Sequence, residues 1–365
     1  MNRPLGLYLH VPFCLSKCRY CDFFSGRASE TEKEAYVAAL EKKITALSKT
    51  ENVRSFTSVY FGGGTPTAIG AERLTRLLCA VKTVGLAENA EVSFEANPAT
   101  VTKEDLCALR KSGFNRISIG VQSFVPDELS SLGRIHSASD AEKTVLDALE
   151  AGFENVSLDL MLGIPGQTKQ SALYSLEKAL SLGITHLSAY CLKLEPGTKM
   201  FEDYPDGKGL PTDEETADIY LALVSRAEEK GMEQYEISNF ARSGFPCRHN
   251  ILYWELGEYI GLGPSAHSFF GGKRFEFPRN KEFFFENSAD PFFGAVSEDL
   301  DPETEYVMLS LRTAKGISKE KITQKAIAKM ENYVKADFAR KTEEGFALTP
   351  EGFLVSTHII SDILF

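Results

Sequence analysis

The sequence lacks any apolar run that approaches the roughly 18 residues of a membrane-spanning helix. Its N-terminus also lacks the long apolar core and the small-residue cleavage site of a signal peptide, so we expect a cytoplasmic protein. There is no basic excess either, because the formal net charge is −11 and the lysines and arginines are scattered. Nucleic-acid binding usually requires a basic patch or stripe, so we expect no nucleic-acid partner.

Cysteine is scarce, with seven residues in 365, yet three of them fall in one short stretch. Cys14, Cys18 and Cys21 follow the spacing C-x3-C-x2-C, shortly after His10. A structural zinc ion and a ferredoxin cluster each take four protein ligands. Three thiolates on one loop can instead hold three irons of a [4Fe–4S] cube and leave the fourth iron open to S-adenosylmethionine (SAM). The alternatives are a zinc loop completed by His10, or three unrelated thiols.

The remaining cysteines are given no part in this site. Cys79 and Cys107 fall in apolar helical patterns and Cys191 lies on a predicted strand, so we expect all three to be buried. A reducing compartment suits the three-thiolate loop, because exposed thiolates oxidise outside the cell.

Six β-rich runs alternate with helical patterns along the first two thirds of the chain. The predicted strands span residues 5–11, 58–61, 91–95, 116–121, 155–162 and 186–194. The predicted helices span 31–47, 71–84, 103–112, 138–151, 170–182 and 213–230, and the fourth begins at Ser137 or Ser139. This alternation predicts parallel strands with right-handed crossovers. Six units are too few for a closed eight-fold barrel, so we expect an α/β fold with an open, partial (β/α)6 barrel.

The pattern changes beyond about Lys230. Residues 270–295 are rich in phenylalanine and glycine and show no clear period, whereas helical patterns return from Pro302. The segment 346–352 and the helix after it look like a small winged-helix-type module, to which we assign no DNA binding. We therefore expect two domains: residues 1–235 as the partial barrel, and residues 236–365 as a smaller, mixed, partly winged-helix-like domain.

Residues suited to ligand binding cluster where the predicted strands end. They are Gly63, Gly64, Thr65, Glu95, Gln122, Arg134 and Asp159. Barrel enzymes place their ligands at this end of the strands. A glycine turn lets a ligand approach the backbone closely, and Glu95 could accept a hydrogen bond from an ammonium group or a ribose. Asp159 is costly to bury alone, and Arg134 could be its partner. Each polar residue alone also fits a structural salt bridge, but their grouping favours a ligand site.

These motifs resemble those of radical SAM proteins of the coproporphyrinogen III oxidase-like family, over nearly the whole chain. The resemblance implies that the cluster is held by Cys14, Cys18 and Cys21, with Tyr20 flanking the adenine. It implies contacts with a first SAM molecule from Tyr8, Gly63 and Glu95. In the oxygen-independent oxidase a further set of positions binds a second SAM. The resemblance matches those positions with Gly64, Thr65, Gln122, Arg134 and Asp159 of this chain.

Departures from the oxidase pattern indicate a particular branch of that family. The oxidase continues its motif to a fourth cysteine, where this chain has Phe23, and it carries a substantial N-terminal extension that this sequence lacks. The stretch His249-Asn-x-x-Tyr253-Trp254 and the Gly-Leu-Gly-Pro-Ser-Ala-His267 stretch resemble the haem-binding branch of the HemW type. The resemblance implies a haem chaperone that passes haem to haem-accepting proteins, with an oxidase-type decarboxylase as the alternative.

Haem contact is expected at the His249 stretch. Imidazole is a good axial ligand, and Tyr253 and Trp254 offer flat apolar faces to a porphyrin. The alternative is that His249 forms hydrogen bonds in a packed corner while Trp254 belongs to the core; His267 and Cys247 are competing ligands. We expect the C-terminal region to fold over the open mouth and to set haem near the cluster. A client could also bring the chain to a membrane surface.

Overall fold

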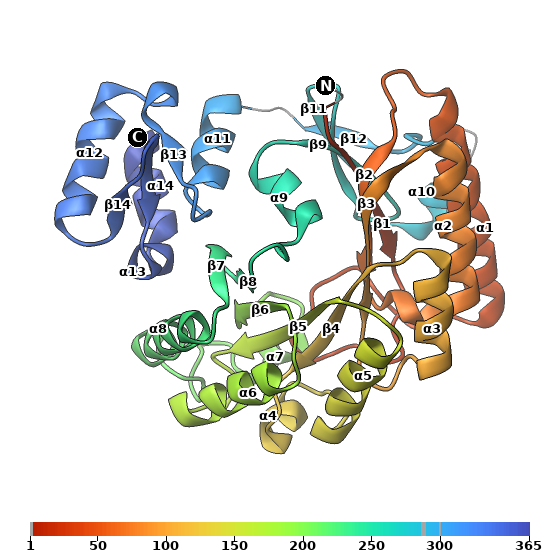
Figure 1. Cartoon of the computed structure of the whole chain (residues 1–365), viewed down its shortest axis with the longest axis horizontal. Helices are drawn as coiled ribbons and strands as arrows, with labels where there is room; N and C mark the ends of the chain where they lie inside the picture. The colour runs from red at the N-terminus through yellow and green to blue at the C-terminus, as the bar shows by residue number, and fades with distance from the viewer. Residues whose placement is uncertain (1–2, 286–289, 299–300) are drawn as a thin grey trace.

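The computed structural model describes residues 3–285, 290–298 and 301–365 (Figure 1). Six strands pair in parallel and in chain order. They are β1 (Leu5–Val11), β2 (Phe56–Gly63), β3 (Leu86–Ala96), β4 (Arg116–Gln122), β5 (Asn155–Leu162) and β6 (His186–Cys191). The predicted strand–helix alternation and the open, partial barrel are therefore confirmed.

Helices cover the convex side of this curved sheet, as Figure 1 shows. They are α1 (Glu30–Ala46), α2 (Ala71–Val84), α3 (Lys103–Ser112), α5 (Ala138–Glu150), α6 (Lys169–Ser181) and α8 (Asp213–Glu229). Five of these six begin at a serine or threonine that forms a capping box with the residue three positions on: α1, α3, α5, α6 and α8. Ser137 caps α5, which decides between the two predicted starts.

Short elements fill the connections between these units. They are the 3₁₀ turns Leu47–Lys49 and Pro66–Ile69 and the helices α4 (Pro126–Ser131) and α7 (Lys199–Asp203); the helix α10 (Lys281–Phe285) and the 3₁₀ turn Lys319–Lys321 come later in the chain. The core between sheet and helices is aromatic at its centre, where the ring of Phe114 lies 5.1 Å from that of Phe61 and 5.2 Å from that of Phe94.

Both edges of the barrel sheet are extended by later parts of the chain. β8 (Asn239–Ala241) pairs with β6, and β7 (Glu233–Glu236) pairs with β8. On the other edge β9 (Glu258–Leu262) runs parallel to β1 and leads to β10 (His267–Phe270), β11 (Lys273–Glu276) and β12 (Val296–Glu298). The expected boundary between residues 235 and 236 thus needs correction, because residues 236–298 contribute strands to the same sheet as the barrel.

The separate C-terminal unit is smaller than expected and begins at Pro302. It contains α11 (Pro302–Ser310), β13 (Ile317–Ser318), α12 (Gln324–Lys335), β14 (Ala339–Lys341), β15 (Gly345–Leu348), α13 (Pro350–Leu354) and α14 (Ser356–Leu364). Its strands form their own antiparallel sheet in the order β13-β15-β14. A small helical unit with a short hairpin agrees with the winged-helix-like expectation.

Helix α9 (Arg248–Trp254) closes the barrel at the N-terminal ends of its strands, on the concave side of the sheet in Figure 1. A Cβ at Gly6, near the start of β1, would lie 3.1 Å from Leu252 and 3.2 Å from His249. The reason is topological: β9 runs parallel to β1, so the helix just before it meets the starting edge of both strands. The His249 stretch therefore lies away from the open mouth, over which we expected the C-terminal region to fold.

Burial of the scattered cysteines also differs from expectation, because Cys79, Cys107 and Cys191 are exposed and Cys247 is buried. Helix α2 buries Leu74, Leu77, Leu78 and Val81, and position 79 falls outside that face. Within the described ranges, none of the helices combines the length and apolar character needed to cross a membrane.

Candidate functional site

The cysteine loop follows β1 at the C-terminal edge of the barrel. Its two ends are tied together, because the Cys14 N–H donates to the Gly26 carbonyl at 2.9 Å and the Gly26 N–H donates to Pro12 at 3.1 Å. Its middle is tied to the loop after α4, where the Arg19 N–H donates to the Leu132 carbonyl at 3.1 Å. The loop is thus a braced structure that can hold three side chains in fixed positions.

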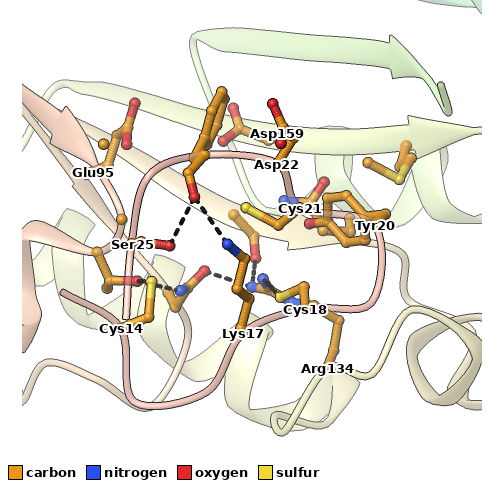
Figure 2. Close-up of a pocket in the computed structure, with 18 of the residues that line it drawn as sticks. Cys14, Lys17, Cys18, Tyr20, Cys21, Asp22, Ser25, Glu95, Arg134 and Asp159 are labelled. Carbon is orange, nitrogen blue, oxygen red and sulfur yellow. Dashed lines mark hydrogen bonds between the residues drawn. The ribbon is translucent and has the colours of Figure 1, made fainter. Parts of the chain in front are cut away.

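The three predicted thiols, Cys14, Cys18 and Cys21, are free, half-buried and gathered around one cavity (Figure 2). The cavity has a volume of about 470 Å³. Cys14 Sγ lies 3.4 Å from Thr65 Oγ1, and Arg134 Nη1 donates to Cys18 Sγ at 3.2 Å. A guanidinium beside a sulfur stabilises the thiolate that a metal cluster requires. The donor set therefore fits a [4Fe–4S] cluster with one iron open.

The zinc alternative requires His10 as a fourth ligand, and the structure engages both of its ring nitrogens elsewhere. Nδ1 lies 3.1 Å from the Tyr8 hydroxyl and Nε2 lies 3.0 Å from the Phe24 carbonyl. In the part of the chain that the structure describes, no three His, Cys, Asp or Glu side chains surround a single point in a way that suits one metal ion. Thiols spread around a cavity suit a cluster, in which each binds a different iron.

The glycine turn at the end of β2 lies directly beside the cysteine loop. A Cβ at Gly64 would lie 2.6 Å from the Phe13 carbonyl oxygen and 3.0 Å from Cys14 Sγ, so a larger residue would displace the loop. Gly63 has a φ of 112° and a Cβ there would lie 2.7 Å from the His10 ring. Both glycines line the cavity and leave backbone groups open to a ligand.

Two half-buried carboxylates, Glu95 on β3 and Asp159 on β5, line the same cavity, and Figure 2 shows them together with the three thiols. Burial, and then the neighbouring charge of Asp159, raise the pKa of Glu95 to about 7. Burial also raises the pKa of Asp159, which accepts a hydrogen bond from Ser118 Oγ at 3.1 Å. An ammonium or sulfonium ligand would offset the cost of ionising these groups.

Arg134 has different partners from the one expected. It donates to Cys18, to Asn97 Oδ1 at 2.6 Å and to the Gly120 carbonyl, so it braces the cluster loop against β4. Asn97 in turn donates to Thr65 Oγ1 at 2.8 Å. Asn97, to which the sequence analysis assigns no role, thus joins the cysteine loop to the glycine turn through Arg134 and Thr65.

Gln122 sits at the end of β4 with a φ of 71°, a left-handed conformation that is uncommon for a non-glycine residue. The sheet register shifts between Gly120 and Gln122, and the Gln122 side chain lines the cavity. Strained backbone of this kind is concentrated at ligand sites, where it aims a side chain.

The structure brings most of the predicted site residues together around the cavity and leaves Tyr8 and His249 outside its lining. The cavity is lined by Cys14, Cys18, Tyr20, Cys21, Gly63, Gly64, Thr65, Glu95, Gln122, Arg134 and Asp159. Tyr8 lies beneath this lining, with its ring stacked on Tyr60 at 6.3 Å and its hydroxyl directed at His10. Arg279 is an unpredicted member that pairs with Asp22 at 3.1 Å. It comes from a segment without sequence periodicity.

His249 lies at the opposite end of the barrel and is fully buried. Nδ1 is 2.8 Å from Ser58 Oγ and Nε2 is 2.6 Å from the Tyr253 hydroxyl. Burial, followed by the charge of Arg116, lowers the pKa of His249 to about 3. No ring nitrogen is left for a haem iron in this conformation. These hydrogen bonds agree with the packed-corner alternative for His249, although Trp254 is half-buried and lies outside the core.

The competing ligands differ in accessibility. Cys247 is fully buried and its thiol donates to Glu91 Oε1 at 3.5 Å. The His267 side chain is half-exposed on β10, with Nε2 lying 3.3 Å from Glu276 Oε2. Of the three predicted haem ligands, His267 alone lies at the surface.

A second cavity, of about 1000 Å³, lies between α9 and the C-terminal unit. We call it the α9 groove. Its aromatic lining is Tyr235, Trp254 and Tyr306, and its cationic side chains are Lys315 and Lys321. Trp254 is thus partly accessible at the groove and does not belong to the core.

The similarities of the chain to known proteins agree with this geometry. Residues 8–179 match the radical SAM superfamily. The Bacillus subtilis protein named heme chaperone HemW is 34% identical over 362 residues, which cover 96% of this chain and 94% of that protein. The chain belongs to the HemW family. An Escherichia coli protein of the same name is 39% identical over 266 residues, covering 72% of this chain and 70% of that protein.

The fold of this HemW family member is shared with Escherichia coli coproporphyrinogen III oxidase, HemN, described as a radical SAM enzyme. The TM-score is 0.83 with 23% identity, over 99% of this chain and 90% of that chain. At this identity the comparison speaks for the fold alone. The superfamily binds a [4Fe–4S] cluster and SAM, and the three thiols, the glycine turn and the two carboxylates fit these two groups.

Proposed function

We propose that this protein is a haem chaperone, which holds a [4Fe–4S] cluster and SAM at the strand ends and passes haem to haem-accepting proteins. The observation that carries the proposal is the similarity of this chain, over 96% of its length, to a protein named heme chaperone HemW. Phe23 supports it, because an exposed phenylalanine stands where the oxidase motif continues to a fourth cysteine. The reducing cytoplasm is the compartment that suits its free thiols.

Within the strand-end cavity, Cys14, Cys18 and Cys21 would hold the cluster and Arg134 would compensate its charge. When bound, the cluster supplies an open iron and an electron for SAM. Gly63 and Glu95 would hold the methionine moiety, with Tyr20 against the adenine. Gly64, Thr65, Gln122 and Asp159 line the same space and match the positions of a second SAM.

Haem needs a separate site for reasons of size. Pockets of about 300–1,000 Å³ each hold one ligand of moderate size. The strand-end cavity, at about 470 Å³, would be occupied by the cluster and SAM, so haem would need a different space. The α9 groove, at about 1000 Å³, has room for a porphyrin and contains Trp254 of the His-Asn-x-x-Tyr-Trp stretch.

The lining of the α9 groove suits a flat, apolar dianion. Trp254 and Tyr306 offer aromatic faces to the porphyrin, and Lys315 and Lys321 offer cations to its two propionates. Lys315 pairs with Glu255 at 3.1 Å and Lys321 lies 4.6 Å from the centroid of the Tyr306 ring, so haem would replace these contacts. Glutamates on the same lining, Glu255, Glu320, Glu343 and Glu344, would repel propionates placed elsewhere and so restrict the orientation of haem. A site without a strong axial ligand holds haem weakly enough for release to an acceptor.

The test is anaerobic transfer from the cluster-loaded, haem-loaded protein to an apo-globin, followed by the Soret band of the acceptor. We expect saturable haem binding near one equivalent and transfer that is faster than from haem–albumin. Absence of saturable binding would overturn the chaperone proposal. A parallel assay for coproporphyrinogen III conversion tests the alternative, and many turnovers per chain would establish a decarboxylase instead.

A further inference from the structure

A continuous set of side chains connects the strand-end cavity with α9. At the cavity, the Glu95 carboxylate accepts a hydrogen bond from the Tyr60 hydroxyl at 3.0 Å. Tyr60 projects from β2 into the barrel interior, where its ring stacks on His249 with 5.3 Å between centroids and 25° between planes. The position of the Tyr60 hydroxyl therefore depends on the His249 ring against which the tyrosine ring packs.

The support under Tyr60 is rigid. The His249 ring is held at both nitrogens, by Ser58 at 2.8 Å and by the Tyr253 hydroxyl at 2.6 Å. The helix itself is fixed at its start, because Glu91 accepts hydrogen bonds from the backbone N–H groups of Arg248 at 3.0 Å and His249 at 3.1 Å. A shift of the imidazole would break several hydrogen bonds in a site that contains no bulk water.

We propose that Tyr60 and His249 are positioning residues for SAM binding, which hold the Glu95 carboxylate in place from the opposite end of the barrel. The inference rests on the function proposed above, in which Glu95 belongs to the SAM site. This proposal assigns a role to the buried His249, whose ring has no free nitrogen for a haem iron. It also links the two cavities, because Tyr253, which binds His249, is followed by Trp254 of the α9 groove.

The surroundings of Glu95 make this hydrogen bond important. Its charged and titratable neighbours come from six elements: Tyr8 on β1, Tyr60 on β2, Arg116 on β4, Asp159 on β5, Tyr190 on β6 and Tyr253 on α9. Besides Tyr60, the backbone of Gly63 is a hydrogen-bond partner of the carboxylate. Loss of the Tyr60 hydroxyl would leave the side chain more often protonated and less well oriented toward a cationic ligand.

The experiment is a double-mutant cycle on the protein reconstituted with its cluster. SAM affinity is measured by calorimetry for wild type, Tyr60→Phe, Glu95→Gln and the double variant. We expect Tyr60→Phe to weaken binding about three- to tenfold, the worth of one hydrogen bond, and to have no effect in the Glu95→Gln background. His249→Ala should reproduce the loss, and His249→Phe, which keeps a stacked ring, should restore part of it.

A second readout needs no SAM. The carboxylic-acid band of Glu95, isolated as the infrared difference between wild type and Glu95→Gln, should persist to higher pH in Tyr60→Phe. The matched control is Tyr220→Phe, since the buried Tyr220 hydroxyl on α8 donates to the Ile237 carbonyl at 3.0 Å, away from Glu95 and from α9. It should leave SAM affinity and the band unchanged.

The outcomes separate the two proposals. If Glu95→Gln binds SAM as tightly as wild type, the SAM site of the proposed function is wrong and the positioning role falls with it. If Glu95→Gln weakens binding but Tyr60→Phe does not, only the positioning role is wrong. Equal losses from Tyr60→Phe in both backgrounds, or a loss from Tyr220→Phe, would likewise overturn it and indicate general destabilisation.

Discussion

Arg134 Nη1 donates to Cys18 Sγ at 3.2 Å, which brings a buried guanidinium against one of the three thiols of the cysteine loop. A donor to a cluster thiolate favours the reduced, more negative state of the cluster. Arg134→Gln should therefore retain the cluster but shift its reduction potential to a more negative value. Anaerobic redox titration checks this. An unchanged potential with intact iron content would contradict a direct contact between this side chain and the cluster ligand.

The cysteine loop carries the clearest prediction of all. Replacement of Cys14, Cys18 and Cys21 by alanine should abolish the brown chromophore and the bound iron and sulfide, which in wild type should reach about four irons per chain. Cys79→Ala is the matched control, because Cys79 is an exposed thiol on α2. Retention of full iron and sulfide in the triple variant would show that the cluster lies elsewhere.

SAM binding should depend on pH through Glu95. Its pKa in the protein without SAM is raised to about 7, so near neutral pH the carboxyl is ionised only in part. If binding requires the carboxylate, affinity should rise as pH increases from 6 to 7.5, by up to about tenfold per unit below the pKa. Calorimetry at several pH values checks this, with Glu95→Gln as the variant that should lose the slope. A slope that survives in Glu95→Gln would assign it to another group.

The two proposed haem locations can be separated by substitution. Trp254→Ala and Lys321→Glu should each weaken haem binding in the α9 groove, whereas His249→Ala should leave the axial ligation seen in the Soret spectrum unchanged. His267→Ala tests the exposed histidine on β10. If the Soret spectrum changes in His267→Ala while Trp254→Ala and Lys321→Glu keep the wild-type haem affinity, haem binds at His267 on β10 and not in the α9 groove.

Most of the barrel could be predicted from the sequence because local patterns determine it. The strand predicted at residues 5–11 and the helix predicted at 103–112 have the observed bounds, and Ser137 was one of two predicted caps. The cysteine loop, the glycine turn, Glu95 and Asp159 could be placed together because parallel strands bring their C-terminal ends to one edge. The comparisons do not test the ligand that each residue contacts, so those roles stay predictions.

Features that depend on distant pairing could not be predicted. Nothing local indicates that β9 pairs with β1, yet that pairing places α9, and hence His249, at the floor of the barrel. Arg279 reaches the cavity from a segment with no periodicity. Burial of His249 follows from the same pairing, which packs its ring against Tyr60, and no local pattern in the sequence distinguishes this buried histidine from an accessible one.

Buried, neutral His249 should make the protein sensitive to acid. Its folded-state pKa, about 3, is below the usual value of about 6.5, so as pH falls below 6.5 the unfolded chain takes up a proton that the native imidazole does not. As the pH is lowered, His249 alone should therefore reduce the free energy of unfolding by about 1.4 kcal/mol per pH unit. Between pH 6.5 and pH 5 this amounts to about 2 kcal/mol.

Urea unfolding of the cluster-free protein at pH 7 and pH 5 measures this loss, since acid release of the cluster then plays no part. His249→Gln should lose less stability between the two pH values than wild type, by about 2 kcal/mol. His358→Gln, which replaces an exposed histidine on α14, is the control and should match wild type. Equal losses in wild type and His249→Gln would mean that His249 is protonated in the native state. That result would also undermine the hydrogen bonds by which it supports Tyr60.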